Sequence, residues 1–372
     1  MGKALAYDLC KHGNCKNMTV TDMDEKRVKE LKNWLVQNFP DNDLEGVVLN
    51  IEDKEKVREL FQEHDTVISA VWYRYNAMLA ELAVQEGCNF CDLGGNNDVV
   101  SKELALDASA KEAGVTIVPD CGLAPGMIAV LAKDAFERLG NIDTLELRVG
   151  GLPQDPTGPL NYMLIFSVHG LINEYVEPAV LIKNGNKVVR PSLDDVEELE
   201  FPEPFGKMEA FNTSGGTSTL PDTYSDRVRN LNYKTIRYLG HCRYMRALYD
   251  LGFMSSEPVG EGDGALVPRD FLSRFFERTL PKGGKDVTLL RVNAIAGERK
   301  LRYQMIDRFD EGTGLTSMMR TTSFPTSIIA QMITDGTIEK RGSLTPERCV
   351  PTDQFMKELA KRNINIEVQE ML

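Results

Sequence analysis

The chain has 372 residues, more than a single domain of about 100 to 200 residues usually holds, so we expect two domains. Hydrophobic residues make up 42% and charged residues 27% of the sequence, which is typical of globular proteins and argues against fibrous, disordered and membrane-embedded classes. The formal net charge is −13 without any lysine- or arginine-rich run, so nucleic acid and membrane surfaces are poor partners. We expect a small-molecule ligand.

The seven cysteines are an odd number scattered through the chain, which favours a reducing cytoplasm over a secreted disulfide framework. Cys88 and Cys91 have the C-x-x-C spacing of zinc and redox sites, but no second pair of that kind and no histidine pair follows. We therefore expect both to be buried strand residues and expect no metal site. No apolar stretch approaches the ~18 to 20 residues that span a bilayer, and we expect a cytoplasmic protein.

Short β-branched runs alternate with amphipathic helical patterns over the first 140 residues, as in a parallel α/β sheet with crossover helices. The predicted strands are Met18 to Thr21, Gly46 to Asn50, Thr66 to Val71, Asn89 to Leu93 and Val115 to Pro119. The predicted helices are Lys3 to Lys11, Glu25 to Phe39, Lys54 to Glu63, Tyr75 to Glu86 and Ser101 to Glu112. These lengths predict a doubly wound, Rossmann-type parallel sheet.

Longer strand patterns with alternating apolar and polar residues follow, which predicts an α+β domain with a mixed or antiparallel sheet. They cover Leu145 to Val149, Tyr233 to Tyr238, Val287 to Ile295 and Arg302 to Asp307, whereas the acidic stretch Asp194 to Pro204 is typical of a solvated loop. Helical patterns at Ser327 to Thr334 and Thr352 to Arg362 end the chain. We expect a dinucleotide-binding domain at residues 1–125, a substrate domain at 126–325, and a segment at 326–372 that returns to the first domain.

A dinucleotide site needs a strand, a glycine-rich turn and an acid about 20 residues further on. Gly2 opens the first helical pattern, and Asp22 follows the next strand at the expected spacing. If Gly2 is the third glycine of G-x-G-x-x-G, the first strand and two glycines are absent from the sequence. We then expect the chain as written either to be part of a longer one or to be weakly folded and deficient in NAD binding.

A second interpretation of the same residues is equally open. Gly2 is then incidental, and Asp22 and Asp24 only cap the following helix. Under the nucleotide interpretation, the Asp22 carboxylate favours NAD because it repels the 2′-phosphate of NADP, although Arg27 lies near enough in sequence to oppose this.

Several specific strings carry a family resemblance. They are Ile68-Ser69-Ala70-Val71-Trp72-Tyr73, Asp92-Leu93-Gly94-Gly95, Pro119-Asp120-Cys121-Gly122-Leu123-Ala124-Pro125-Gly126-Met127, the run from Phe166 to Tyr175, Glu209-Ala210-Phe211-Asn212-Thr213-Ser214-Gly215-Gly216-Thr217-Ser218-Thr219, and the run from Tyr233 to His241. With these strings the chain resembles the saccharopine dehydrogenase superfamily, and within it most closely the lysine 6-dehydrogenase group. The resemblance covers nearly the whole chain.

The resemblance implies a Rossmann domain, a substrate domain built on a mixed sheet, and a C-terminal return to the first domain. It also implies NAD-dependent oxidation of the ε-amine of L-lysine to the 6-semialdehyde with release of ammonia, in a homodimer or larger homo-oligomer. Two departures weaken the resemblance. The family's first strand and opening Gly-x-Gly are absent, and His169, which we expect to be structural, stands where an acidic residue is common.

Arg237, on a predicted strand, is the first candidate for binding the substrate carboxylate, and a scaffold ion pair is the alternative. The glycine-rich loop that contains Thr213, Ser214 and Gly215 offers backbone N–H groups to the substrate, unless it is only a turn that requires positive φ. Trp72 and Tyr73 are candidate walls of the nicotinamide pocket, with Tyr73 assigned to the substrate, and interdomain packing is the alternative.

Asp92, His241 and Asp120 are candidates for base and water activation, because each lies beside glycines or at a predicted strand end. A histidine titrates near neutral pH, although a lone histidine is more often structural. We assign cofactor contacts to Gly2, Asp22, Ala70, Val71, Gly94 and Gly122. The rival functions are a reductase of the saccharopine or carboxynorspermidine type and a catalytically silent binding homologue.

Overall fold

The computed structural model describes residues 1–13, 15, 17–261 and 264–371. The chain divides into two compact units: unit 1 is Met1–Val130 with Met319–Asn363, and unit 2 is Leu131–Met318 with Ile364–Leu372. The divisions lie a few residues from the predicted boundaries at 125 and 325, and the last residues belong to unit 2.

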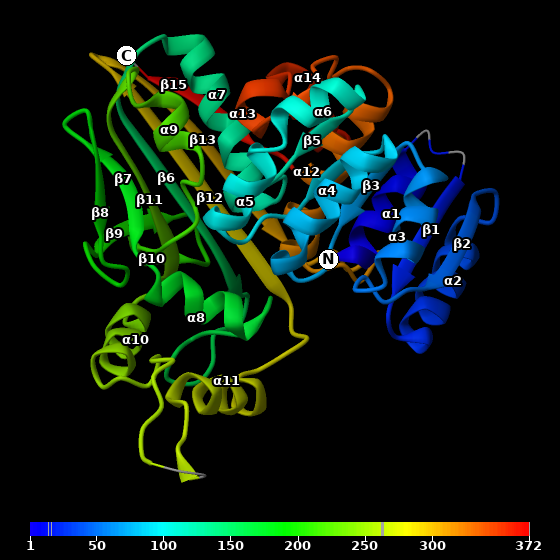
Figure 1. Cartoon of the computed structure of the whole chain (residues 1–372). Coiled ribbons are helices and arrows are strands. Elements are labelled where there is room, and N and C mark those ends of the chain that lie inside the picture. The colour runs from blue at the N-terminus through cyan, green and yellow to red at the C-terminus, as the bar shows by residue number, and fades with distance from the viewer. Residues whose placement is uncertain (14, 16, 262–263, 372) are drawn as a thin grey trace. The chain divides into compact units, whose positions relative to one another are not determined.

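Unit 1 alternates strands with helices (Figure 1). Its elements are α1 (Gly2–His12), β1 (Asn17–Asp22), α2 (Glu25–Asn38), β2 (Asp43–Val48), α3 (Lys54–Gln62), β3 (Thr66–Ser69), the 3-10 turn η1 (Tyr73–Tyr75), α4 (Asn76–Glu86), β4 (Asn89–Asp92), α5 (Asn97–Leu104), α6 (Asp107–Ala113), β5 (Thr116–Val118), the turn η2 (Leu123–Met127), α12 (Ser317–Thr334), β14 (Gly342–Ser343), α13 (Pro346–Cys349) and α14 (Thr352–Lys361).

All strand pairs of unit 1 that lie in the described residues are parallel, which confirms the predicted Rossmann-type α/β class. The strands form two sheets, one of β1 and β2 and one in the order β14-β5-β4-β3. Phe90 and Cys91 of β4 and Ile117 and Val118 of β5 are fully buried. Consecutive buried apolar residues of this kind are typical of strands covered on both faces.

Local sequence explains where the helices of unit 1 begin and end. Asp24 caps α2, because its side chain accepts the backbone N–H groups of Lys26 and Arg27. Gly87 and Gly114 follow α4 and α6 in the left-handed conformation, with φ of 72° at both positions.

Three predicted elements differ from the structure. The second strand lies at Asp43–Val48, several residues earlier than predicted. The helix predicted for Ser101 to Glu112 is two helices, α5 and α6, and Asn96 caps the first with its side chain. The acidic stretch predicted as a loop contains the strand β9 (Glu197–Phe201), because its acidic residues point away from the core and meet basic side chains.

Unit 2 contains longer strands, as the alternating pattern predicted. Its elements are α7 (Ile128–Leu139), which begins in unit 1, β6 (Ile142–Pro153), α8 (Val168–Val176), β7 (Ala179–Lys183), β8 (Asn186–Arg190), β9, β10 (Gly206–Asn212), α9 (Leu220–Tyr224), β11 (Val228–Tyr238), α10 (His241–Asp250), α11 (Pro268–Thr279), β12 (Asp286–Ala296), β13 (Arg299–Arg308) and β15 (Glu367–Met371).

The described strands of unit 2 form one mixed sheet in the order β15-β13-β12-β6-β11-β10-β9, and β7 adds to β11 and pairs with β8 (Figure 1). β6 and β11 are parallel, whereas β12 runs antiparallel to β6 and to β13. The mixed sheet confirms the predicted α+β class of the second domain.

Cys88 and Cys91 are buried and form no disulfide; Cys91 lies in β4, as predicted, whereas Cys88 directly precedes that strand. Among the residues with described positions, no helix is long and apolar enough to cross a membrane.

Candidate functional site

Arg237 is a buried cation near the end of β11, with its side chain 3% exposed. Its Nε donates to Tyr175 Oη at 3.1 Å, one terminal nitrogen donates to the carbonyl of Ile236 at 3.0 Å, and the other to Glu174 Oε2 at 3.5 Å. A guanidinium has five N–H donors, so these contacts leave two for a ligand. Arg237 is therefore placed to bind a carboxylate.

His241 accepts a hydrogen bond from Tyr175 and does not titrate near neutral pH. Its Nε2 lies 2.9 Å from Tyr175 Oη, and its Nδ1 lies 2.9 Å from the carbonyl of Leu160, which fixes Nδ1 as the protonated nitrogen. Burial, with the charge of Arg237, lowers the pKa of His241 to about 3. These contacts and the low pKa argue against the predicted proton transfer and make His241 a neutral acceptor that holds Tyr175 against Arg237.

Glu174 on α8 was missed by the sequence analysis. Its side chain is 31% exposed and borders Arg237, and burial raises its pKa to about 7 against the opposing effect of Arg237. A carboxyl group with this pKa exchanges a proton at neutral pH. Glu174 and Tyr175 belong to the run from Phe166 to Tyr175 that carries the family resemblance. The raised pKa of Glu174 results from its burial beside β11, and this long-range packing cannot be predicted from hydrophobic periodicity.

The loop of Thr213, Ser214 and Gly215 lies beside the same residues. Ser214 donates its backbone N–H to the carbonyl of Glu174 at 3.1 Å and its hydroxyl to the carbonyl of Asn173 at 3.2 Å. Gly215 has a φ of 83°, as the turn interpretation requires. The loop thus anchors α8, and its hydroxyls are engaged within the protein.

Tyr162 completes this group, and its sequence context gave no signal. Its ring lies under the guanidinium of Arg237, 5.0 Å from centroid to Cζ. Tyr162 is 1% exposed, and its hydroxyl has no hydrogen-bond partner among the described residues. A buried, unsatisfied hydroxyl is costly unless a ligand or water completes it. We call Tyr162, Glu174, Tyr175, Arg237 and His241 the Arg237 cluster.

Unit 1 has a cavity of about 2200 Å³. Four of the predicted cofactor residues line it: Gly2, Asp22, Ala70 and Val71. Gly2 lies against Ala70, since a Cβ added at Gly2 would be 3.8 Å from Ala70 Cβ. The first turn of α1 contains no acidic residue and no side-chain cap. A helix N-terminus of this kind attracts phosphate.

Asp22 lines this cavity, whereas its neighbour Asp24 serves as the helix cap. Asp24 caps α2, whereas Asp22 accepts the backbone N–H of Asp24 at 2.9 Å. Arg27 approaches both carboxylates, at 4.0 Å from Asp22 and 3.7 Å from Asp24. One cation therefore faces two anions at this position.

Asp92, Asp120, Gly94 and Gly122 form a separate group, outside the residues that line the cavity. Asp92 Oδ1 accepts the backbone N–H groups of Gly94 at 2.5 Å and Asp120 at 3.2 Å. Burial and the neighbouring Asp92 raise the pKa of Glu103 to about 11, so the Glu103 carboxyl keeps its proton beside Asp92 at neutral pH. Asp92 thus organises the β4 and β5 turns, and a Cβ at Gly94 would clash with Asp120.

Tyr73, the last predicted substrate residue, lies in unit 1 and packs against Gly95, where a Cβ would be 2.9 Å from the tyrosine ring. Its ring meets Trp72 edge-on at 6.2 Å. The structure therefore brings Arg237, His241, Thr213, Ser214 and Gly215 together in unit 2 and places Tyr73 in the other unit.

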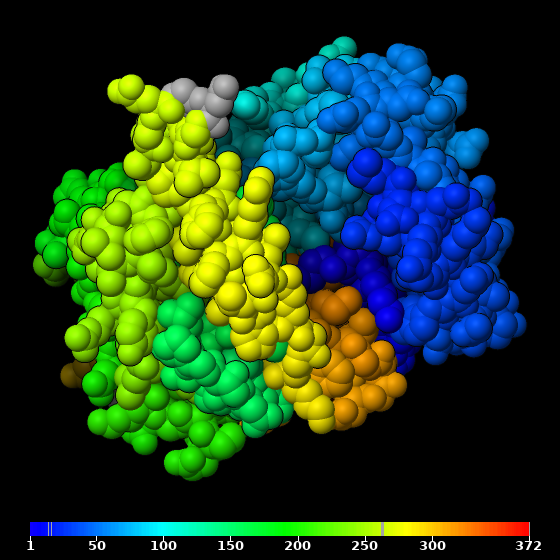
Figure 2. All heavy atoms as spheres, turned by 90° about the horizontal axis from the view of Figure 1, so that it is seen from below, coloured from blue at the N-terminus to red at the C-terminus, as the bar shows by residue number. Residues whose placement is uncertain are grey.

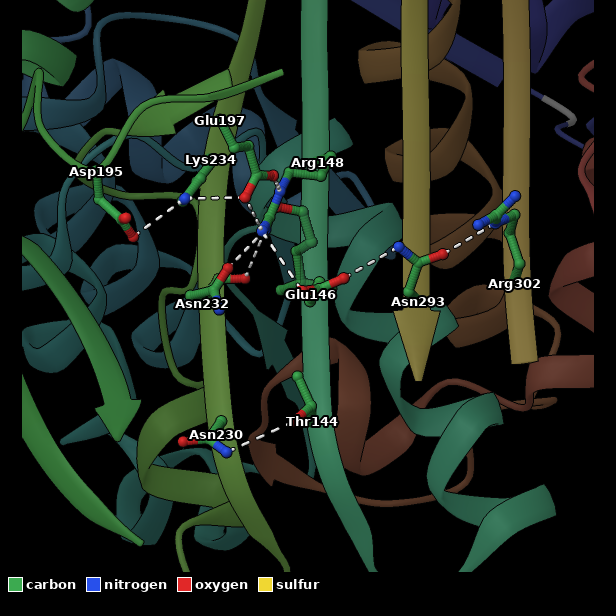
Figure 3. A network of polar contacts seen from close by, with 11 residues as sticks. Thr144, Glu146, Arg148, Asp195, Glu197, Asn230, Asn232, Lys234, Asn293 and Arg302 are labelled. Carbon is green, nitrogen blue, oxygen red and sulfur yellow. Dashed lines mark hydrogen bonds and ion pairs between the residues drawn. The ribbon is translucent and has the colours of Figure 1, made fainter. Parts of the chain in front are cut away.

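A second polar network crosses the sheet of unit 2 (Figure 3). Glu197 accepts from Lys234 at 3.0 Å and from Arg148, and Arg148 also donates to Asn232 at 2.6 Å. Arg148 and Lys234 are each less than 5% exposed. Because each cation is paired, this network is a structural ion cluster.

Comparisons with known proteins agree with this architecture. A model described as "Saccharopine dehydrogenase NADP binding domain" matches residues 1–118, and one described as "Saccharopine dehydrogenase C-terminal domain" matches residues 122–364. The chain is 23% identical to "Saccharopine dehydrogenase [NADP(+), L-glutamate-forming]" of Pyricularia oryzae, over 87% of this chain and 88% of that protein.

It is also 24% identical to "Carboxynorspermidine synthase" of Vibrio cholerae, over 65% of this chain and 61% of that protein. Among solved structures, apo saccharopine dehydrogenase (L-Glu forming) from Saccharomyces cerevisiae superimposes with a TM-score of 0.78 at 19% identity, and the match covers 100% of this chain and 97% of that one. This likeness shows a shared fold.

Proposed function

Because the chain belongs to the saccharopine dehydrogenase family, we propose that it is a pyridine-nucleotide-dependent oxidoreductase that acts on a carbon–nitrogen bond of an amino acid. The Arg237 cluster carries this proposal. It combines a buried cation with free donors, an unpartnered tyrosine hydroxyl and a carboxyl group that titrates near pH 7. These are the groups that bind an amino acid carboxylate and accept a proton from an amine.

The unit 1 cavity fits a pyridine nucleotide. The N-terminal turn of α1 would hold the pyrophosphate, Asp22 the adenosine ribose, and Ala70 and Val71 would line the site. When bound, the nicotinamide supplies the hydride acceptor. The chain's own residues then bind the substrate carboxylate at Arg237 and take the ammonium proton at Glu174.

NAD is the proposed cofactor, although the family model and two relatives are named for NADP. Asp22 and Asp24 surround Arg27, so the site has a net charge of −1 where NADP would add a 2′-phosphate. The carboxylates repel that phosphate, and Asp22 accepts hydrogen bonds from the ribose diol of NAD.

L-Lysine is the proposed substrate, oxidised at its ε-amine. The reaction loses a proton to the protein and a hydride to NAD, and water then converts the imine to the 6-semialdehyde and ammonia. Arg237 provides one buried cation, which suits a substrate with a single carboxylate. The second candidate is saccharopine, favoured by relatives matched over most of their length.

Product analysis separates the candidates. The purified chain is incubated with NAD or NADP and either L-lysine or saccharopine, and ammonia, glutamate and the reduced nucleotide are measured. Ammonia with NADH from lysine is expected. Glutamate from saccharopine, without turnover of lysine, would replace the first candidate by the second, and no turnover of either would contradict the amino acid assignment.

A further inference from the structure

The start of helix α10 is held by a carboxylate from another strand. α10 begins at His241, directly after Gly240, which occupies the N-cap position and provides no side-chain cap. Gly240 has a φ of 92°, a left-handed conformation that favours glycine over the usual capping residues. Glu209 of β10 supplies the acceptors instead: its Oε2 accepts the backbone N–H of Gly240 at 2.8 Å, and its Oε1 accepts that of Cys242 at 2.6 Å. The two hydrogen bonds lie on either side of His241.

The register of the sheet also relates Glu209 to Arg237. The two residues are directly opposite each other in the antiparallel ladder of β10 and β11, so their side chains leave the same face of the sheet. Two residues, Leu239 and Gly240, connect the end of β11 to His241. The positions of Arg237 and of the start of α10 are therefore both fixed relative to Glu209.

His241 connects the start of α10 to the guanidinium of Arg237. Its Nε2 lies 2.9 Å from Tyr175 Oη, and Tyr175 Oη accepts from Arg237 Nε at 3.1 Å. The ring of Phe211, two residues along β10 from Glu209, lies nearly parallel to the ring of His241, at 6.4 Å between centroids and 12°. In Figure 2, the yellow-green atoms of α10 and the yellow atoms of α11 lie beside the green atoms of α8, the helix that carries Tyr175. A shift of the start of α10 would therefore move the imidazole and the tyrosine hydroxyl that orients Arg237.

Asp286 makes the same kind of contact elsewhere in unit 2. Its two carboxylate oxygens accept the backbone N–H groups of Ser317 at 2.6 Å and Met318 at 2.8 Å, at the start of α12. Asp286 begins β12, whereas the members of the Arg237 cluster come from α8, β11, α10 and the segment between β6 and α8. Asp286 is therefore a reference for a buried carboxylate that caps a helix without contributing to the cluster.

We propose that Glu209 is a positioning residue of the Arg237 cluster: through the start of α10 it holds His241, and through Tyr175 it orients the remaining donors of Arg237 toward the substrate carboxylate. This inference rests on the proposed function for its substrate, whereas the contacts that carry it all lie within unit 2. Binding of a carboxylate by a guanidinium depends on the orientation of its planar donors. Loss of a contact at Glu209 should therefore weaken carboxylate binding and leave the hydride step unchanged.

The test compares Glu209→Gln with two matched controls. Gln keeps the shape of Glu209 but has a single carbonyl acceptor, so one of the two N–H groups loses its partner. Glu198→Gln changes the exposed carboxylate directly opposite Glu209 on β9, and Asp286→Asn weakens the cap of α12. In Glu209→Gln we expect the KM for the amino acid that the natural chain oxidises to rise about tenfold, as for the loss of about one hydrogen bond, with kcat and the affinity for NADH nearly unchanged. Both controls should keep the natural KM, although Asp286→Asn should lower the melting temperature.

The ring of His241 gives a measurement that does not require turnover. Burial keeps the pKa of His241 at about 3, so its NMR signals in the natural chain should not titrate between about pH 5 and 8. In Glu209→Gln the loosened ring should titrate nearer the ordinary histidine pKa of about 6.5, and its Nδ1–H should exchange faster with solvent. The signals are assigned by their absence in His241→Gln. Glu209→Asp, which keeps the charge but is one methylene shorter, is the second variant and should show the same changes in KM and titration.

A raised KM together with a titrating His241, in a Glu209 variant and in neither control, supports the proposal. An unaltered KM or an unchanged His241 signal in the folded variants overturns it. An equal rise of KM in Asp286→Asn also overturns it, because KM would then follow stability. If neither Glu209 variant folds, Glu209 is a scaffold residue and the proposal fails. Absence of turnover in the natural chain would instead contradict the proposed function, and the His241 signals would then decide the positioning role by themselves.

Discussion

At the residue scale, Arg237 differs from the other cations of unit 2 because its contacts leave donors unused. Arg148 and Lys234 are just as buried, but each is matched by carboxylates of the Glu197 network. Among the described carboxylates, Arg237 pairs with the partly protonated Glu174, at 3.5 Å. Burial of a cation with an incomplete set of partners is expensive, so the arrangement indicates a ligand.

Replacing Arg237 with Ala is expected to raise the KM for the amino acid about thirtyfold or more, because a buried charge-assisted pair contributes roughly 2 to 5 kcal/mol. The affinity for NADH should remain nearly unchanged. The matched control is Arg243→Ala, which removes an exposed arginine of α10. Initial rates over a range of substrate concentrations measure the effect, and an unaltered KM in a folded Arg237→Ala protein would assign Arg237 to the scaffold.

Asp22→Asn is expected to weaken NAD binding and to reduce the discrimination against NADP, because the substitution removes the carboxylate that repels the 2′-phosphate and accepts from the ribose. Asp24→Asn is the control, since Asn remains a good helix cap. Nicotinamide fluorescence gives both dissociation constants. Equal losses for NAD and NADP would leave Asp22 with a purely structural role.

Protonation of Glu174 should make both the stability of the protein and the activity of the Arg237 cluster depend on pH. Its pKa of about 7 in the folded protein lies above the ordinary carboxyl value of about 4.3, so the folded state binds more protons between these limits. The free energy of unfolding should therefore fall as pH rises through this window, while the proposed base becomes active above pH 7. In Glu174→Gln, the unfolding free energy and the reaction rate should both lose this dependence on pH. Urea unfolding and rate profiles between pH 5 and 8 provide the measurement, and an identical profile in the variant would exclude Glu174.

At the element scale, hydrophobic period was sufficient to predict most helices and strands, because period 2 and period 3.6 are local properties. The parallel and mixed classes of the two sheets were predictable for the same reason. β9 was missed because its stability comes from pairing with β10 and from ion pairs to distant strands, and neither is visible in an acidic local sequence. Likewise, residues from α8, β11 and α10 meet only in the folded Arg237 cluster.

The β9 network gives a prediction at this scale. Glu197→Ala leaves the buried Arg148 and Lys234 without their shared carboxylate, and should destabilise the protein by ~2 kcal/mol, less than a fully buried pair because 35% of the Glu197 side chain is exposed. Glu198→Ala on the same strand is the control, since its pair with Lys207 is exposed on both sides. Chemical denaturation at pH 7 compares them, and equal effects of the two substitutions would contradict the prediction.

The pH dependence of this network has the opposite sign to that of Glu174. Burial opposes ionisation of Glu197, but hydrogen bonds and charges from Arg148 and Lys234 prevail and lower its pKa. The stabilisation is therefore complete above the unfolded carboxyl pKa and is lost as pH falls below about 4. The difference in unfolding free energy between the natural chain and Glu197→Ala should shrink in that acidic range.

At the scale of the whole molecule, the two units differ in how their sheets are completed. Unit 2 has a continuous mixed sheet, whereas unit 1 is interrupted and depends on segments from both ends of the sequence. Asp8 of α1 and Arg362, just after α14, form a fully buried ion pair at 2.8 Å, 354 residues apart in sequence. This ion pair therefore connects α1, the first helix of unit 1, to the end of α14, its last helix.

The chain's two tryptophans, Trp34 and Trp72, both lie in unit 1, so tryptophan fluorescence reports unit 1 whereas circular dichroism reports the backbone of both units. Trp34 packs against Tyr7 of α1 at 5.8 Å between ring centroids. Asp8→Ala leaves the buried Arg362 with the partly exposed Glu358, 2.6 Å away, as its remaining carboxylate partner, and should destabilise unit 1 by ~3 kcal/mol. We expect the urea concentration at the midpoint of the fluorescence transition to fall. The part of the dichroism transition that comes from unit 2 should keep the midpoint that it has in the natural chain.

The double variant Asp8→Leu with Arg362→Met separates charge from packing. Replacing both partners of a buried pair by apolar residues of similar size is often neutral, so the fluorescence midpoint should recover most of the loss. Failure to recover would mean that the shape of the pair, and not its unpaired charge, holds α1 in place. If the fluorescence and dichroism midpoints instead shift by the same amount in Asp8→Ala, the two units unfold in one cooperative step. Loss of the ion pair in unit 1 would then also lower the stability of the sheet of unit 2, contrary to the prediction.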